Sequence, residues 1–305
     1  MNRDFLYSKT NDTENISPEQ LDSEEIEMNK IIDEYIQHPD CKLYIENFKT
    51  IKPICEEVLK QRHPEIKEKE WSKNISINDA IKYAHQFLTT IDSTLADQFM
   101  NLVYQNNNNQ KTLNILPNYI KPYCEKGKAY INYHDKIENM ITLLHEMVHA
   151  MGYSDAMNTN SAYRYLSESP TLIIENLFSK WLVKNKVITQ NDYNLLKEWR
   201  LRDSQDVASK TLMEIALIDM RKKGKYITKK RVLEMIDEKQ HINNFTTREE
   251  CIKYFLMKVL TKRQLYFKES ERYVIGQYIS DKLDKTRNPE KEFLEIYYLA
   301  SNPNI

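Results

Sequence analysis

Two histidines and a glutamate stand together in the segment HEMVH, as His145, Glu146 and His149. Residues four apart lie on one face of an α-helix, with Cβ atoms roughly 5–6 Å apart, so both imidazoles can reach one metal ion. Glu146 is offset by one position, from which its carboxylate can reach a water molecule on that ion. This spacing is typical of zinc metallopeptidases, in which the glutamate accepts a proton from the water. An ordinary amphipathic helix that carries two histidines explains the pentapeptide equally well when it is taken alone.

A zinc site of this kind needs a third protein ligand, and the segment SESPTLIIENLF offers one. Glu168 lies just before Pro170, where a helix starts or kinks. Glu175 follows seven residues later, two turns along the same face. We predict that Glu168 is the third ligand and that Glu175 orients a ligand histidine, because metal-bound imidazoles usually donate their other N–H to a carboxylate or carbonyl. For each glutamate, a solvated helix carboxylate is the alternative.

The segments AYINYHDKIENMITLLHEMVHAM and SESPTLIIENL together resemble the catalytic core of the M3 oligopeptidases, the family of thimet oligopeptidase and oligoendopeptidase F. The resemblance implies a mostly α, gluzincin-like zincin catalytic domain with a small β-sheet beside the active-site helix. It also implies one bound Zn2+ ion, with His145, His149 and Glu168 as ligands and Glu146 as the catalytic base.

In that family an edge strand precedes the histidine-bearing helix and pairs with the substrate. By the same resemblance, strand residues 129 to 133 pair with the backbone of a peptide substrate. The substrate-binding candidates in this strand are Ile131, Asn132 and Tyr133.

The C-terminal segment ERYVIGQYISDKL resembles the tyrosine-rich segment of the same family, in which a tyrosine hydroxyl stabilises the tetrahedral oxyanion. Tyr273 is the first candidate for this role, and Tyr266 and Tyr278 are the alternatives. The chain departs from the family at Val148, where Gly is usual, and at Gly152, where His is common. It is also about half the usual length, so the substrate size selection of the family does not carry over.

The composition limits the fold and the partners. The chain is 41% hydrophobic and has only 4 Gly and 9 Pro among 305 residues, which favours a mostly helical fold with a sizeable core. A net charge of -1 argues against a general nucleic-acid binder. The four cysteines form no CxxC pair, so they indicate reduced thiols in the cytoplasm and not a disulfide framework. No apolar stretch approaches the roughly 20 residues of a membrane span. The sequence does not indicate the oligomeric state.

The order of elements predicts a polar, mobile tail over residues 1–22 and a single helical metallopeptidase domain over 23–305. Within this domain, 23–110 is the helical N-terminal part and 111–305 the catalytic part, with NNNNQ at 106–110 as the loop between them. We expect strands in TLNILPNYI and KAYINYH, and then helices from residue 136 onward. Loops are expected near YSDAMNTNS, LRDSQD and KTRNPEK.

The function expected from these features is that of a zinc-dependent endopeptidase or oligopeptidase acting on a peptide or protein substrate. One alternative is a zinc-stabilised binding protein derived from a peptidase and no longer catalytic, against which the presence of Glu146 argues. Another is an exported effector protease with one specific protein substrate, because export without a cleaved signal leaves no trace in the sequence. A helical interaction protein without any metal is the third.

Overall fold

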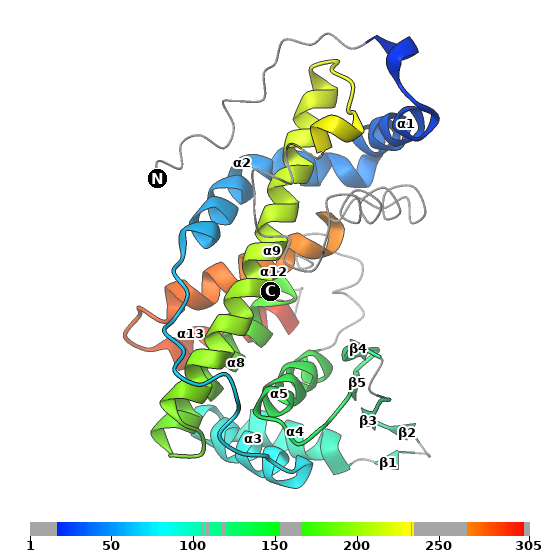
Figure 1. Ribbon diagram of the computed structural model, residues 1–305. Helices are drawn as coiled ribbons and strands as arrows, with labels where there is room; N and C mark the ends of the chain where they lie inside the picture. The colour runs from blue at the N-terminus through cyan, green and yellow to red at the C-terminus, as the bar shows by residue number, and fades with distance from the viewer. Residues whose placement is uncertain are drawn as a thin grey trace. The chain divides into compact units, whose positions relative to one another are not determined.

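The computed structural model describes residues 17–104, 106–107, 110–117, 120–152, 166–232, 234 and 267–301 (Figure 1). This part of the chain is mostly α-helical with a small sheet, as predicted; the sheet has three strands, of which β4 was not expected. Most of the expected N-terminal tail and the loop expected near YSDAMNTNS lie outside the described residues. Of that tail, the described residues form the 3-10 turn η2 (Pro18–Gln20) and the Asp22 cap of the next helix.

The chain divides into two compact units, Met1–Gln61 with Asp203–Glu271, and Arg62–Arg202 with Arg272–Ile305. The division expected near residue 110 does not coincide with these boundaries. One boundary falls inside the 33-residue helix α9 (Gln190–Lys222), so a continuous helix contributes to both units.

In the first unit, α1 (Ser23–Gln37) and α2 (Pro39–Lys60) accompany the second half of α9. Asp22 caps α1 by accepting hydrogen bonds from the N–H groups of Glu24 and Glu25. Asn29 of α1 exchanges two hydrogen bonds with the backbone of Ile227, at 2.8 and 2.9 Å. These contacts join the N-terminal helix to the segment that follows α9.

The loop expected at LRDSQD is wrong, because α9 continues through these residues. Leu201, Ser204 and Gln205 are buried there. The Gln205 amide donates to the carbonyl oxygens of Val58 and Gln61. Some of the polar side chains that suggested a solvated loop therefore form hydrogen bonds with distant parts of the chain. A sequence pattern does not reveal such partners.

The second unit is built around α5 (Ile137–Met151), which packs against α3 (Ile77–Ile91), α4 (Ser93–Tyr104), α8 (Ser169–Lys184) and the sheet. Figure 1 shows α5 between the strands on one side and α8 on the other. Eleven of the fifteen α5 residues are buried, as expected for a helix covered on most of its faces. The remaining helices are α12 (Phe267–Leu283), which belongs to this unit from Arg272 on, and α13 (Pro289–Ser301), which packs on α8.

The sheet has the order β3-β5-β4, with β3 (Leu113–Ile115) parallel and β4 (Tyr123–Glu125) antiparallel to β5 (Lys128–Ile131). Ala129 and Ile131 are buried in the core. The turn between β4 and β5 places Lys126 and Gly127 at φ values of 49° and 72°, the left-handed pair of a type I′ hairpin. Because β5 is central, both of its edges are already paired.

Part of the loop expected at NNNNQ forms structure instead. Residues Asn106–Asn107 (β1) and Gln110–Lys111 (β2) pair as a short antiparallel ladder. These residues of the NNNNQ segment thus form strand hydrogen bonds, although the composition of the segment suggested only a loop.

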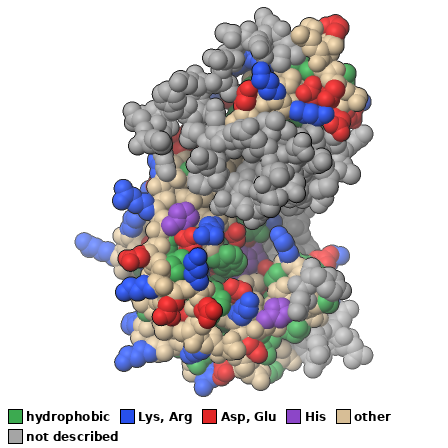
Figure 2. Space-filling view, in the orientation of Figure 1, with side chains coloured by type: hydrophobic (Ala, Val, Ile, Leu, Met, Phe, Trp, Pro, Cys, Tyr) green, Lys and Arg blue, Asp and Glu red, His purple; other side chains and the backbone are tan. Residues whose placement is uncertain are grey.

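No helix in the described parts of the chain is both long enough and apolar enough to span a membrane. Figure 2 shows basic and acidic side chains interspersed over the coloured part of the visible surface.

Candidate metal centre

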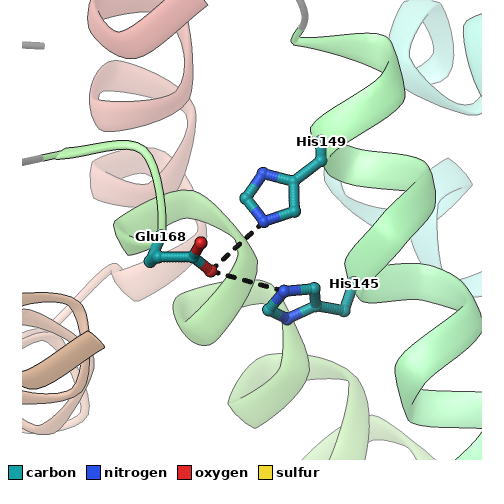
Figure 3. Close-up of side chains that lie close together, drawn as sticks. All are labelled: His145, His149 and Glu168. Carbon is teal, nitrogen blue, oxygen red and sulfur yellow. Dashed lines mark hydrogen bonds and ion pairs between the residues drawn. The ribbon is translucent and has the colours of Figure 1, made fainter. Parts of the chain in front are cut away.

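Two histidines project from successive turns of α5 toward the start of α8. The ring centroids of His145 and His149 lie 4.8 Å apart. Figure 3 shows both imidazoles directed at the carboxylate of Glu168. His145 is only 9% exposed, because the apolar faces of α5 pack on α8 and the sheet around it.

Glu168 lies at the N-cap of α8, and its side chain makes no capping hydrogen bond with that helix. Pro170 follows in the first turn, where its missing N–H costs no helical hydrogen bond. Glu168 is 2% exposed, and its Oε2 lies 3.2 Å from His149 Nε2 and 3.4 Å from His145 Nε2. The predicted helix start is therefore confirmed, and it directs the carboxylate at both histidines.

The three side chains offer ligand atoms that all lie within 4.8 Å of one another and could hold a metal ion. Zinc bonds of 2.0–2.1 Å in a tetrahedral arrangement set neighbouring ligand atoms about 3.4 Å apart. The two nitrogen–oxygen distances of 3.2 and 3.4 Å match that edge. Two imidazoles and one carboxylate are ligands that zinc and other divalent transition metals accept, so the three residues could hold a metal ion of this class.

Glu175 stands behind His145. Its Oε1 lies 2.6 Å from Nδ1 of His145, while Arg200 donates from Nε to Glu175 Oε2 at 2.8 Å. Arg200 also donates to the Glu175 carbonyl and to the Ser179 hydroxyl. The imidazole Nδ1 is therefore occupied by a carboxylate that is itself held in place, which leaves Nε2 directed at Glu168.

His145 and the neighbouring glutamates shift one another's pKa values. Burial opposes a charged imidazole, yet the Glu168 and Glu175 carboxylates hold the pKa of His145 well above its usual value. Burial likewise opposes charge on Glu168, but His149 and His145 keep its pKa well below the usual range. Burial also acts against Glu175, whose pKa Arg200 and His145 nevertheless lower. The two carboxylates thus favour the charged form of His145, next to the point on which His145, His149 and Glu168 converge.

Glu146 differs from these two glutamates. It is 7% exposed, and burial raises its pKa above the usual value. The histidines oppose this rise and the negative charges of Glu168 and Glu175 add to it. A carboxylate in such surroundings holds a proton more readily than a solvated one.

Of the three candidate tyrosines, Tyr273 on α12 lies at this site. Desolvation first, and then the negative charge of Glu168, raise the pKa of its hydroxyl, with smaller contributions from Glu146 and from a hydrogen bond to Glu168. Tyr278 is half-buried further along α12, with Lys282 Nζ 4.9 Å from its ring centroid. Tyr266 lies outside the described residues.

The strand expected to receive the substrate is covered. Both edges of β5 are paired over Lys128–Ile131, by β3 and by β4, and Ile131 is 1% exposed. The Asn132 amide donates a hydrogen bond to the carbonyl oxygen of Ile120. The Tyr133 hydroxyl donates a hydrogen bond to the carbonyl oxygen of Ile75. The expectation of an edge strand here is therefore wrong, because the β4–β5 hairpin adds one more strand outside it.

Two neighbours of the site were not foreseen from the sequence. Cys124 on β4 lies close enough that the charges of Glu146 and Glu168 add to the effect of burial and raise the pKa of its thiol to about 12. Arg272 on α12 pairs with Glu168 Oε1 at 3.3 Å. The only sequence signal for Arg272 was its position next to Tyr273.

Comparison of the chain with protein-family models, with curated proteins and with solved structures gave no match in any of the three.

Proposed function

We propose that this protein is a zinc-dependent peptidase with a gluzincin-like catalytic unit. The observation that carries the proposal is the convergence of His145, His149 and Glu168 on one buried point, with Glu146 on the next position of the same helix. With two imidazoles and one carboxylate as its protein ligands, a bound zinc ion would keep a position for water, as catalytic zinc sites do. A purely structural zinc needs no neighbouring base, so the presence of Glu146 favours catalysis.

The chemistry that a bound zinc ion supplies is polarisation of a water molecule, which lowers the pKa of that water. The Glu146 carboxylate is the proton acceptor, and its burial makes it a readier one than a solvated glutamate. After attack on the peptide carbonyl, the same carboxyl group can return the proton to the leaving amine. The Tyr273 hydroxyl, whose pKa is raised by burial and then by the nearby Glu168 carboxylate, can donate a hydrogen bond to the developing oxyanion.

The sheet edge nearest these groups is β4, which is paired on one side only within the described sheet. In a two-residue hairpin the residues that flank the turn are hydrogen-bonded, so the next pair, Cys124 with Ala129, directs the backbone groups of Cys124 outward. An extended peptide can add to this edge as a further strand. We therefore assign the substrate backbone to β4, in place of strand 129 to 133.

The first experiment is elemental analysis of purified wild type, Glu168→Ala and Glu146→Gln. We expect about one zinc per chain in the wild type and in Glu146→Gln, and a clear loss in Glu168→Ala. Glu138→Ala, on the half-exposed side of the same α5 helix, is the control and should keep its zinc. Absence of zinc from the wild type after reconstitution would refute the proposal.

The second experiment is cleavage of a peptide library by the same proteins. Glu146→Gln should lower kcat by about 10²–10⁴-fold while zinc stays bound, because it removes only the proton acceptor. A wild-type protein that binds zinc and cleaves nothing, including candidate protein substrates, would instead be an inactive binding protein.

A further inference from the structure

The two oxygens of the Glu168 carboxylate have different partners. Oε2 faces the Nε2 atoms of His145 and His149, at 3.4 and 3.2 Å. Oε1 faces the other way, 3.3 Å from Nε of Arg272. Arg272 Nε is buried and makes no hydrogen bond within the described part of the protein, although Glu168 Oε1 lies just beyond ideal bonding distance. The guanidinium also lies over the ring of Tyr273, 5.3 Å from its centroid.

A stripe of residues four apart on α12 brings Arg272 to this position. Gly276 packs directly on the start of α8: a Cβ atom there would lie 2.8 Å from Leu172 Cδ1 and 3.1 Å from both C and O of Glu168. One turn further on, the Ser280 hydroxyl donates to the Leu172 carbonyl at 3.2 Å. Residues 272, 276 and 280 share one helix face, so the close approach at Gly276 also brings the Arg272 guanidinium over Glu168.

Glu175, seven residues along α8, has a comparable partner. Arg200 donates to its Oε2, while Oε1 faces His145 Nδ1. In both glutamates an arginine lies within ion-pair distance of one carboxylate oxygen and a histidine faces the other, but only Arg200 also donates a hydrogen bond. In each carboxylate, therefore, one oxygen lies next to an arginine and only the other oxygen faces a histidine.

We propose that Arg272 is a positioning residue that keeps Glu168 a one-oxygen ligand of the metal. A carboxylate can ligate with one or both oxygens, and a second oxygen would occupy the position that a catalytic site keeps open for water. By engaging Oε1, Arg272 leaves Oε2 alone for the ion. This inference rests on the proposed function, because it assumes that His145, His149 and Glu168 hold a metal.

The test uses Arg272→Gln, Arg272→Lys and Gly276→Ala in the full chain, loaded with Zn2+ or with Co2+. Arg287→Gln, the same change at an exposed position, is the matched control. Metal content, the visible spectrum of bound Co2+ and peptide cleavage are measured on each protein, and thermal unfolding checks that each is folded. The cobalt spectrum is the decisive measurement, because it reports coordination number and geometry.

For Arg272→Gln we expect bound metal, a cobalt spectrum shifted toward higher coordination number, and kcat/KM lowered about 10–100-fold. Gly276→Ala should shift the spectrum in the same direction, because its added methyl lifts α12 from Glu168 while the guanidinium itself is unchanged. Arg272→Lys should restore much of the wild-type spectrum, since an ammonium group can still engage Oε1.

Three results count against the proposal. A wild-type cobalt spectrum in metal-loaded Arg272→Gln would show that Arg272 does not constrain Glu168. Complete loss of metal from this variant would show that Arg272 supports the site only as part of the fold. A wild-type protein that binds neither ion would overturn the proposed function, and this inference with it.

Discussion

The buried glutamates near the α5 histidines differ in pKa because their surroundings differ. Burial opposes charge on both Glu168 and Glu175, but His149 and His145 keep the pKa of Glu168 low, and Arg200 and His145 keep that of Glu175 low. For Glu146 burial prevails over the opposing charges of His145 and His149, and its pKa is raised. Chemically identical side chains thus differ in charge preference: two favour the anionic form and one holds a proton more readily, as the proposed roles of these residues require.

Glu175→Gln tests the support behind His145. The amide keeps the shape of the side chain but removes the charge that faces Nδ1 at 2.6 Å and Arg200 Nε at 2.8 Å. We expect zinc affinity to fall about 10–100-fold, measured by competition with a chelator. Glu138→Gln on α5 serves as the control, and equal affinities in the two variants would contradict the assigned role.

Tyr273→Phe tests the oxyanion donor. Because a hydroxyl that acts only in the transition state does not contribute to ground-state binding, kcat should fall about 10²–10³-fold with little change in KM. Tyr278→Phe, five residues along the same helix, should leave both constants near wild type. Steady-state kinetics on one peptide substrate distinguish the two variants, and similar losses in both would remove the assignment of Tyr273.

At the scale of elements, side chains at the start of α9 fasten the extended segment before α3. Asp192 is completely buried and accepts hydrogen bonds from the N–H groups of Ser72 and Thr189, at 2.9 and 2.8 Å, and from their hydroxyls. Burial raises its pKa, but these hydrogen bonds outweigh burial and lower it below the usual 3.8. This carboxylate therefore stabilises the fold in its charged form.

Asp192→Asn should lower the free energy of unfolding by about 1.5–3 kcal/mol at neutral pH, because it removes hydrogen bonds to a charged acceptor. A carboxyl group with a lowered pKa contributes its stabilisation above its ordinary pKa and loses it as pH falls through the lowered value. The difference in free energy of unfolding between Asp192→Asn and the wild type should thus shrink below pH 3.8. Urea unfolding from pH 7 to pH 3 measures it, with the exposed Asp97→Asn as the control. A difference that does not change with pH would contradict this account.

At the scale of the whole molecule, a metal at this site would join α5 to α8 through ligands nineteen residues apart. A ligand that binds only the folded state adds about 2.7 kcal/mol of stability at a free concentration of 100 times its Kd. Calorimetry of the wild type should therefore show a higher unfolding temperature with zinc than with a chelator. Glu168→Ala should show no such difference.

The rise in unfolding temperature that zinc causes should decrease as pH is lowered, because the histidine ligands must lose their protons to bind the ion. Unfolding temperatures measured with and without zinc over a series of pH values provide this comparison. An increment of the same size in wild type and Glu168→Ala would place the stabilising zinc elsewhere in the chain.

The sequence determined the local features, because helix periodicity and capping act over a few residues. It indicated a mostly helical chain, put His145 and His149 on one helix face, and placed the start of a helix at Glu168 and Pro170. The periodic pattern of α5 and the position of a proline are readable without knowledge of any distant residue.

Only the tertiary structure decided which distant groups complete the site. Arg200 reaches Glu175 across 25 positions, and Arg272 reaches Glu168 from another helix through the close approach at Gly276. The pairing of β4 with β5 likewise makes β4, and not the strand that the sequence indicated, the outer strand of the sheet among the described residues. Such contacts depend on how apolar faces and sheet edges of separate segments pack together, and that packing leaves no periodic signal in the chain.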